Sequence, residues 1–193
     1  RTYVHVGSAK PAKALRFFRK LAPDNHLELG EKLAELYSDT GQFKKSNAMY
    51  RNLIKASRRS YRVVGYQRAI ADNSRNLGNQ VKAAREIKRI VSLWRKMKSA
   101  PDADPKRVAK DRKGMEESLR SMAVTYHRQA TKTKSDRDYA LAYDLYKEYV
   151  NTFSDAKDAY SMTFYFAELL YSLEKWKQAA ARSAELLPLP SAE

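Results

Sequence analysis

The stretch YSDTGQFKKSNAMY, residues 37–50, has the pattern of a helix end, a glycine turn and a new helix start. Thirty-seven residues later, SRNLGNQVKAAREI, residues 74–87, places a glycine at the equivalent position. The recurrence indicates that the chain is built from one helix–turn–helix unit, which is used several times.

The helices that follow such turns each carry one buried face. Four aligned stretches begin at Phe43, Gln80, Tyr139 and Trp176. Offsets of three, four and three residues from each start trace one side of a helix, so each stretch is predicted to be an amphipathic helix. The residues on this side are Ser46, Tyr50 and Leu53; Ala83, Ile87 and Ile90; Ala142, Tyr146 and Tyr149; and Ala179, Ser183 and Leu186.

A second helix is predicted before each of these, where a large apolar residue is followed by a small one. The small residues are Ala34, Ala71, Ala123 and Ala167. A small side chain at this position lets a neighbouring helix approach closely. The spacing between second helices is 37 residues from 43 to 80 and from 139 to 176, with 59 residues between the second and third copies.

These spacings predict a single domain over residues 1–193. Its parts are a half repeat at 10–26, repeats at 27–60, 61–98, 115–154 and 155–188, and an insertion at 99–114. The prolines and the charge run of the insertion are typical of a loop or an extended helix start, and we assign it as an inserted loop.

The pattern resembles the tetratricopeptide repeat, whose first helix has a small residue after a large one and whose second has an alanine and an aromatic. The resemblance covers residues 27–188. It implies an all-α fold, a right-handed α-solenoid of stacked antiparallel helical hairpins. The spacing exceeds the family's usual period of about 34, so helices about three residues longer are expected.

The third and fourth copies also resemble repeats of bacterial cell-envelope proteins. The similar segment is YDLYKEYVNTFSDAKDAYSMTFYFAELLYSLEKWKQAA, residues 143–180. This likeness implies a periplasmic or cell-envelope location, with the cytoplasm as the alternative. Because the chain starts at Arg1 near a half repeat, we interpret it as part of a larger chain or complex.

Catalytic motifs are absent from the sequence. There is no cysteine, which excludes disulfides and thiol chemistry, and the glycines are too scattered for a phosphate loop. The three histidines lie far apart, with no carboxylate at metal-ligand spacing. The longest apolar stretch, residues 162–173, is too short for a membrane span. We therefore expect no enzymatic activity, no cofactor and no transmembrane segment.

The family resemblance implies that the first helix of each repeat lines a concave groove. The residues expected on that wall are Glu28, Glu31, Glu35 and Ser38; Arg68, Asp72 and Arg75; Glu117, Arg120, Val124 and His127; and Ser161, Phe164, Glu168 and Tyr171. The wall would run from acidic through mixed to aromatic. An exposed aromatic side chain can anchor a partner segment, although polar residues on the wall can equally be solvated.

Charge is concentrated in residues 51–98, where fourteen lysines and arginines face only two acidic residues, a net charge of +12. The whole chain carries +16. Such a segment either docks an anionic partner or simply forms a solvated face. The cations proposed for anionic-surface binding are Arg58, Arg59, Arg62, Arg85, Lys88, Arg89 and Lys96.

The expected function is a non-catalytic scaffold that binds a segment or subunit of another protein in its groove. The alternative is a binder of an anionic surface or polymer, such as a membrane, a cell-wall component or nucleic acid, through the basic segment. Nucleic acid is disfavoured because no base-reading element is visible.

Overall fold

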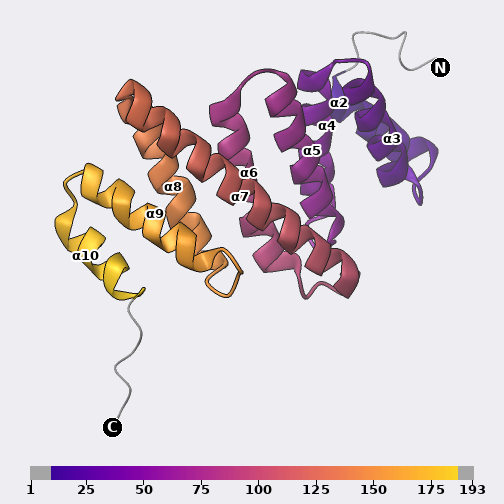
Figure 1. The fold of residues 1–193 in the computed structure, drawn as a ribbon. Helices are drawn as coiled ribbons and strands as arrows, with labels where there is room; N and C mark the ends of the chain where they lie inside the picture. The colour runs from indigo at the N-terminus through magenta and orange to yellow at the C-terminus, as the bar shows by residue number, and fades with distance from the viewer. Residues whose placement is uncertain (1–9, 187–193) are drawn as a thin grey trace. The chain divides into compact units, whose positions relative to one another are not determined.

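The structure, a computed structural model, describes residues 10–186. These residues form nine helices and no strand, which confirms the predicted all-α class (Figure 1). The helices are α2 Pro11–Leu21, α3 His26–Asp39, α4 Phe43–Ala56, α5 Arg62–Asn76, α6 Gln80–Met97, α7 Pro105–Thr133, α8 Asp136–Thr152, α9 Ala159–Ser172 and α10 Trp176–Ala184.

The chain divides into two compact units where the sequence predicts one continuous domain. The first unit extends to Val108 and the second begins at Ala109, within the long helix α7. In the first unit α2 packs on α3 and α4, and each of α3 to α5 packs on the next. In the second unit α8 packs on α9, and α9 packs on α10.

The turns between paired helices share one backbone conformation. Gly41 and Gly78 have φ of 72° and 69°, a left-handed conformation that glycine adopts without steric cost. Lys134 and Glu174 take φ of 56° and 57° in the turns without a glycine. Each of these four residues lies two positions before the helix that follows it. All four turns therefore have a left-handed residue at the same position, although only two of them have the expected glycine there.

Backbone hydrogen bonds repeat in three of these turns. The amides of Gln42, Asn79 and Lys175 donate to carbonyls five residues earlier, at N···O distances of 2.7, 3.0 and 2.9 Å. This bond closes a helix that ends in a left-handed residue and satisfies a carbonyl left over at the helix end. The α3–α4, α5–α6 and α9–α10 turns are thus copies of one structure, as the aligned sequence indicates.

The predicted helix starts agree with the structure at three of four positions. Phe43, Gln80 and Trp176 are the first residues of α4, α6 and α10, whereas α8 begins at Asp136, three residues before the predicted Tyr139. Ser135 causes the earlier start, because its hydroxyl oxygen accepts from the Asp138 amide at 3.3 Å as a helix cap.

The predicted buried faces form the cores of both units. The four small residues of the first helices are all buried, as are the predicted faces of α4, α6 and α8. In the second unit the ring of Tyr146 stacks on that of Phe166, with centroids 5.9 Å apart. The predicted face of α10 is wrong beyond Ala179, because Ser183 is exposed. Helix α10 ends at Ala184, so Leu186 lies outside it.

The predicted loop at 99–114 is wrong from residue 105 onward, because α7 starts there. Asp104 caps this helix: its Oδ1 accepts a hydrogen bond from the Arg107 amide at 2.7 Å. Pro105 occupies the first helical position, where proline is favoured because its missing N–H has no partner to lose. The proline that suggested a loop therefore marks a helix start.

Candidate functional site

A hollow of about 640 Å³ lies in the second unit. Its walls come from α7, α8 and α9. The residues that line it are Val124, His127, Arg128, Thr131, Lys132, Tyr146, Tyr165, Glu168 and Ser172. The structure therefore brings three residues of the expected groove wall, Val124, His127 and Glu168, to one cavity.

The inner wall of this hollow is uncharged at neutral pH. His127 Nδ1 lies 3.3 Å from the hydroxyl of Tyr146, and the two rings meet edge to face. Burial lowers the pKa of His127 below its ordinary value, and the charge of Glu168 opposes this shift only in part. Burial also raises the pKa of the Tyr146 hydroxyl. The exposed charges around the hollow are Arg128, Lys132 and Glu168.

Further aromatic side chains are exposed on α9 and α10. The predicted Phe164 and Tyr171 are 46% and 65% exposed, so neither belongs to the core. Tyr165 lines the hollow, and its ring lies 6.0 Å from that of Phe164. The ring of Tyr171 contacts that of Trp176 edge to face at 4.6 Å. An apolar surface of this kind is typical of protein-binding regions.

The predicted groove face of α9 is rotated by about one residue from the face that lines the hollow. Phe164 and Tyr171 were predicted there, whereas the structure places Tyr165 and Ser172 beside Glu168. Tyr165 was missed. Its signal was its position three residues before Glu168, which places both on one side of the helix.

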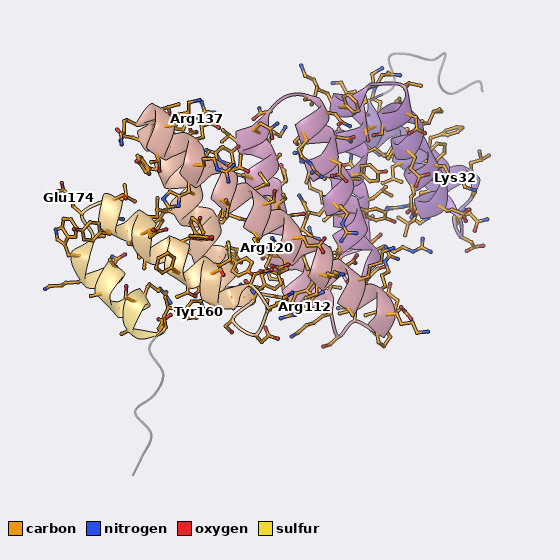
Figure 2. The ribbon with its side chains drawn as sticks, viewed as in Figure 1. Lys32, Arg112, Arg120, Arg137, Tyr160 and Glu174 are labelled. Carbon is orange, nitrogen blue, oxygen red and sulfur yellow. The ribbon has the colours of Figure 1, made fainter. Side chains whose placement is uncertain are left out.

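Arg120, labelled in Figure 2, is part of a polar cluster that joins α7, α8 and the start of α9. Its Nε lies 3.2 Å from Glu116 Oε1 and 3.3 Å from Asp158 Oδ2. The Tyr149 hydroxyl donates to the same Glu116 oxygen at 2.7 Å. Arg120 therefore ties α7 to the start of α9 and does not line the hollow.

Most of the predicted groove residues of the first unit have a partner within that unit. Glu28 pairs with Lys32 on the exposed side of α3 (Figure 2), and Arg75 pairs with Asp72. Glu31 accepts a hydrogen bond from the Tyr66 hydroxyl at 3.2 Å and pairs with Arg62 at 3.7 Å. Of the remaining three residues, Ser38 donates from its hydroxyl to Asn73 Oδ1 at 2.6 Å, Glu35 is exposed and Arg68 is half-buried.

Two stacked tyrosines lie close to the acidic residues of α3. The rings of Tyr50 and Tyr66 are 5.8 Å apart. Burial, followed by the charges of Glu35 and Glu31, raises the pKa of Tyr50 to about 12. Burial and then Glu31 raise that of Tyr66 to about 12. Both hydroxyls therefore remain neutral hydrogen-bonding groups at any physiological pH.

Three of the predicted anion-binding cations line a second hollow, of about 590 Å³, in the first unit. Arg58, Arg59 and Arg62 lie there, in and after the turn from α4 to α5. Lys55 and Asp102 also line it. The sequence analysis missed Asp102, because no local pattern links it to a turn about forty residues earlier.

Asp102 holds the turn in place. One carboxylate oxygen accepts from the Ser60 hydroxyl at 2.5 Å, and the other accepts from the Tyr61 amide at 2.8 Å. These hydrogen bonds, the Ser60 bond first, lower the pKa of Asp102. The carboxylate is therefore ionised at neutral pH and fixes the wall of the hollow just before α5.

The four predicted cations of α6 do not line that hollow, and Arg89 has a structural role. Its Nη1 lies 2.9 Å from both carboxylate oxygens of Glu86, which is only 2% exposed. Gln67 and Arg51 also donate to this carboxylate, at 2.6 and 3.3 Å. Burial of a carboxylate requires such partners. Of the other three, Arg85 and Lys96 are exposed and Lys88 is half-buried.

Comparisons with known proteins leave the chain without an assigned family. No model of a known protein family matches it, and no curated protein matches it either. Within residues 10–186, no helix is both long enough and apolar enough to cross a bilayer. In the same residues, no group of three or more histidine, aspartate or glutamate side chains could hold a metal ion.

Proposed function

We propose that this protein is a non-catalytic scaffold that holds an extended segment of a partner protein in the hollow of its second unit. The observation that supports this most is the continuity between the hollow and the exposed aromatic surface, through the contact of Tyr165 with Phe164. Helix-repeat proteins use concave surfaces of this kind for binding. On this proposal the repeats stack as a right-handed solenoid of the tetratricopeptide type.

The chemistry of the walls defines the preferred segment. An apolar side chain of the partner would lie against Tyr165 and Val124, next to the neutral pair of His127 and Tyr146. The cations at 128 and 132 favour an acidic residue beside it in the partner. The likeness of residues 143–180 to envelope repeats favours a partner in the bacterial periplasm or envelope, with the cytoplasm as the alternative.

A peptide array with a matched pair of variants tests this function. Tyr165 and Tyr160 are both exposed tyrosines of α9, but only Tyr165 lines the hollow. We expect the intact protein to bind peptides that combine a large apolar residue with a nearby carboxylate. Tyr165→Ser should weaken the best of them about tenfold or more, since aromatic hot spots contribute about 2 kcal/mol. Tyr160→Ser should bind like the parent protein.

Equal loss in both tyrosine variants would place the partner elsewhere on α9, and an array without any bound peptide would refute the proposal. Circular dichroism of each variant excludes unfolding as the cause of a loss. Because the apolar contact carries the affinity, raising the salt concentration should weaken binding only moderately.

The basic segment supports a second candidate, the binding of an anionic surface or polymer. Arg85 and Lys96 are exposed on α6, and they lie on one side of this helix at positions eleven apart. An association based on them would fall steeply with salt. Binding to acidic phospholipid vesicles that survives Arg85→Glu with Lys96→Glu would contradict this candidate.

A further inference from the structure

The hollow between α4 and α5 concentrates cations that have no internal partner. Lys55, Arg58 and Arg59 all line it. Among residues 10–186 these three side chains form no ion pair. Like charges held this close repel one another, so an anion in the hollow would relieve their repulsion.

The same hollow contains a buried hydroxyl without a hydrogen bond. Ser57 directly follows α4 as its C-cap residue, and its amide donates to the Leu53 carbonyl at 2.9 Å. Its side chain is only 8% exposed, and within the described part of the chain Oγ has no hydrogen-bond partner. An unpaired buried hydroxyl is costly, and native proteins usually satisfy it. Ser57 lines the hollow, so a ligand there that displaces the atoms covering Oγ would supply the missing acceptor.

The balance of charge around the hollow indicates the charge of the ligand. Four cations, Lys55, Arg58, Arg59 and Arg62, line it together with one carboxylate, that of Asp102. Glu31 lies outside the lining and pairs with Arg62. Two carboxylates against four cations leave a net charge of +2. A dianion would neutralise it.

We propose that this hollow is a binding site for a phosphate monoester, held by Arg58 and Arg59 with Ser57 as a hydroxyl donor. A phosphate group presents several acceptor oxygens and carries a charge close to −2 at neutral pH. Arginine forks match this geometry with paired N–H donors. The volume of about 590 Å³ exceeds what a phosphate group fills, so the organic part of an ester fits as well. This site is independent of the peptide groove in the second unit.

Amide NMR with inorganic phosphate as the probe tests the site in the intact chain at pH 7.5. Sodium chloride at matched ionic strength is the reference. We expect saturable shifts confined to the amides of residues 55–62 and 102. Arg58→Gln with Arg59→Gln should weaken binding about tenfold or more, because two charge-assisted contacts are lost. The control, Lys13→Gln with Arg16→Gln, removes the same charge at exposed positions of α2 outside the hollow and should bind normally.

Ser57→Ala provides an independent check. If the hydroxyl donates to phosphate, this variant binds more weakly by severalfold, while its denaturation midpoint does not fall, because no internal hydrogen bond is lost. Equal weakening in the Arg58/Arg59 and Lys13/Arg16 variants would reduce the effect to general charge and overturn the proposal. Chloride that reproduces the shifts would overturn it too.

A vesicle sedimentation assay identifies whether the phosphate group comes from a lipid or from a soluble ester. Phosphatidylcholine vesicles with and without phosphatidic acid are sedimented with the parent protein and both double variants. Binding that requires phosphatidic acid, Arg58 and Arg59 supports the site with a lipid headgroup as its ligand. Phosphate binding without vesicle binding supports the site with a soluble ester. Absence of both refutes it, and none of these results bears on the peptide groove.

Discussion

Two substitutions at equivalent turn positions should change stability in opposite directions. Gly41 and Glu174 both adopt a left-handed backbone, with φ of 72° and 57°. A Cβ atom at Gly41 would meet nothing within 4 Å, so Gly41→Ala tests the backbone alone. The left-handed conformation costs a non-glycine residue about 1–2 kcal/mol. Alanine also restricts the unfolded chain more than glycine does, and this offsets about 0.4–1 kcal/mol of that cost.

The expected result is a loss of about 1 kcal/mol in the free energy of unfolding for Gly41→Ala. Glu174→Gly should raise it by about 0.5–1 kcal/mol, since glycine removes the conformational cost but has a more flexible unfolded state. Gly114→Ala is the control: Gly114 lies inside α7 with no positive φ and open space at its Cβ. It should stabilise by about 0.5–1 kcal/mol, as alanine does in helices.

Chemical denaturation followed by tryptophan fluorescence measures each unit separately. The chain has two tryptophans, Trp94 in the first unit and Trp176 in the second. Replacing one of them with phenylalanine assigns the signal to the other. Gly41→Ala should therefore lower the midpoint that Trp94 reports, and Glu174→Gly should raise the one that Trp176 reports. The same sign at both turns would refute the proposed equivalence of the two turns.

Three further predictions concern packing, protonation and the buried carboxylate. Ala83→Leu or Ala142→Leu should destabilise the fold by about 1–3 kcal/mol, because both residues are fully buried where helices meet, and unchanged denaturation midpoints would refute the repeat alignment. Because the pKa of His127 is lowered in the folded state, the unfolded chain binds a proton first as pH falls below 6.5. Stability should therefore decrease through that range, and a His127→Gln variant that keeps the same decrease would exclude His127 as its cause. Arg89→Glu should lower the denaturation midpoint more than Arg85→Glu, since only Arg89 contacts a buried carboxylate, and equal effects would contradict this role.

Local periodicity was enough to predict the helix class and most of the turns. Glycine at positions 41 and 78 predicts a left-handed turn residue, because glycine adopts this conformation freely. Lys134 and Glu174 carry no such signal, since neighbouring helices impose a conformation that these residue types disfavour. The start of α7 was misjudged for a different reason: Asp104 followed by Pro105 is a helix start, and the proline was interpreted as a loop residue.

The candidate sites were less predictable than the fold, because they depend on contacts between distant residues. Asp102 reaches the α4–α5 turn across about forty residues, and no periodic pattern encodes that distance. Which side of α9 faces the hollow is decided by how the helix rotates on its neighbours, and a rotation of one residue exchanges Phe164 for Tyr165. The sequence pattern placed Arg89 on the surface. Its partner Glu86 is buried only through tertiary packing, which the local pattern does not encode.

The proposed function requires that the hollow of the second unit holds an extended partner segment. Amide NMR of the intact chain, titrated with the strongest peptide from the array, measures this binding residue by residue. Shifts that saturate and map to Val124, His127, Tyr165 and Glu168, and that disappear in Tyr165→Ser but persist in Tyr160→Ser, are the predicted result. Saturable shifts confined to α3–α6, or shifts retained in Tyr165→Ser, would contradict it.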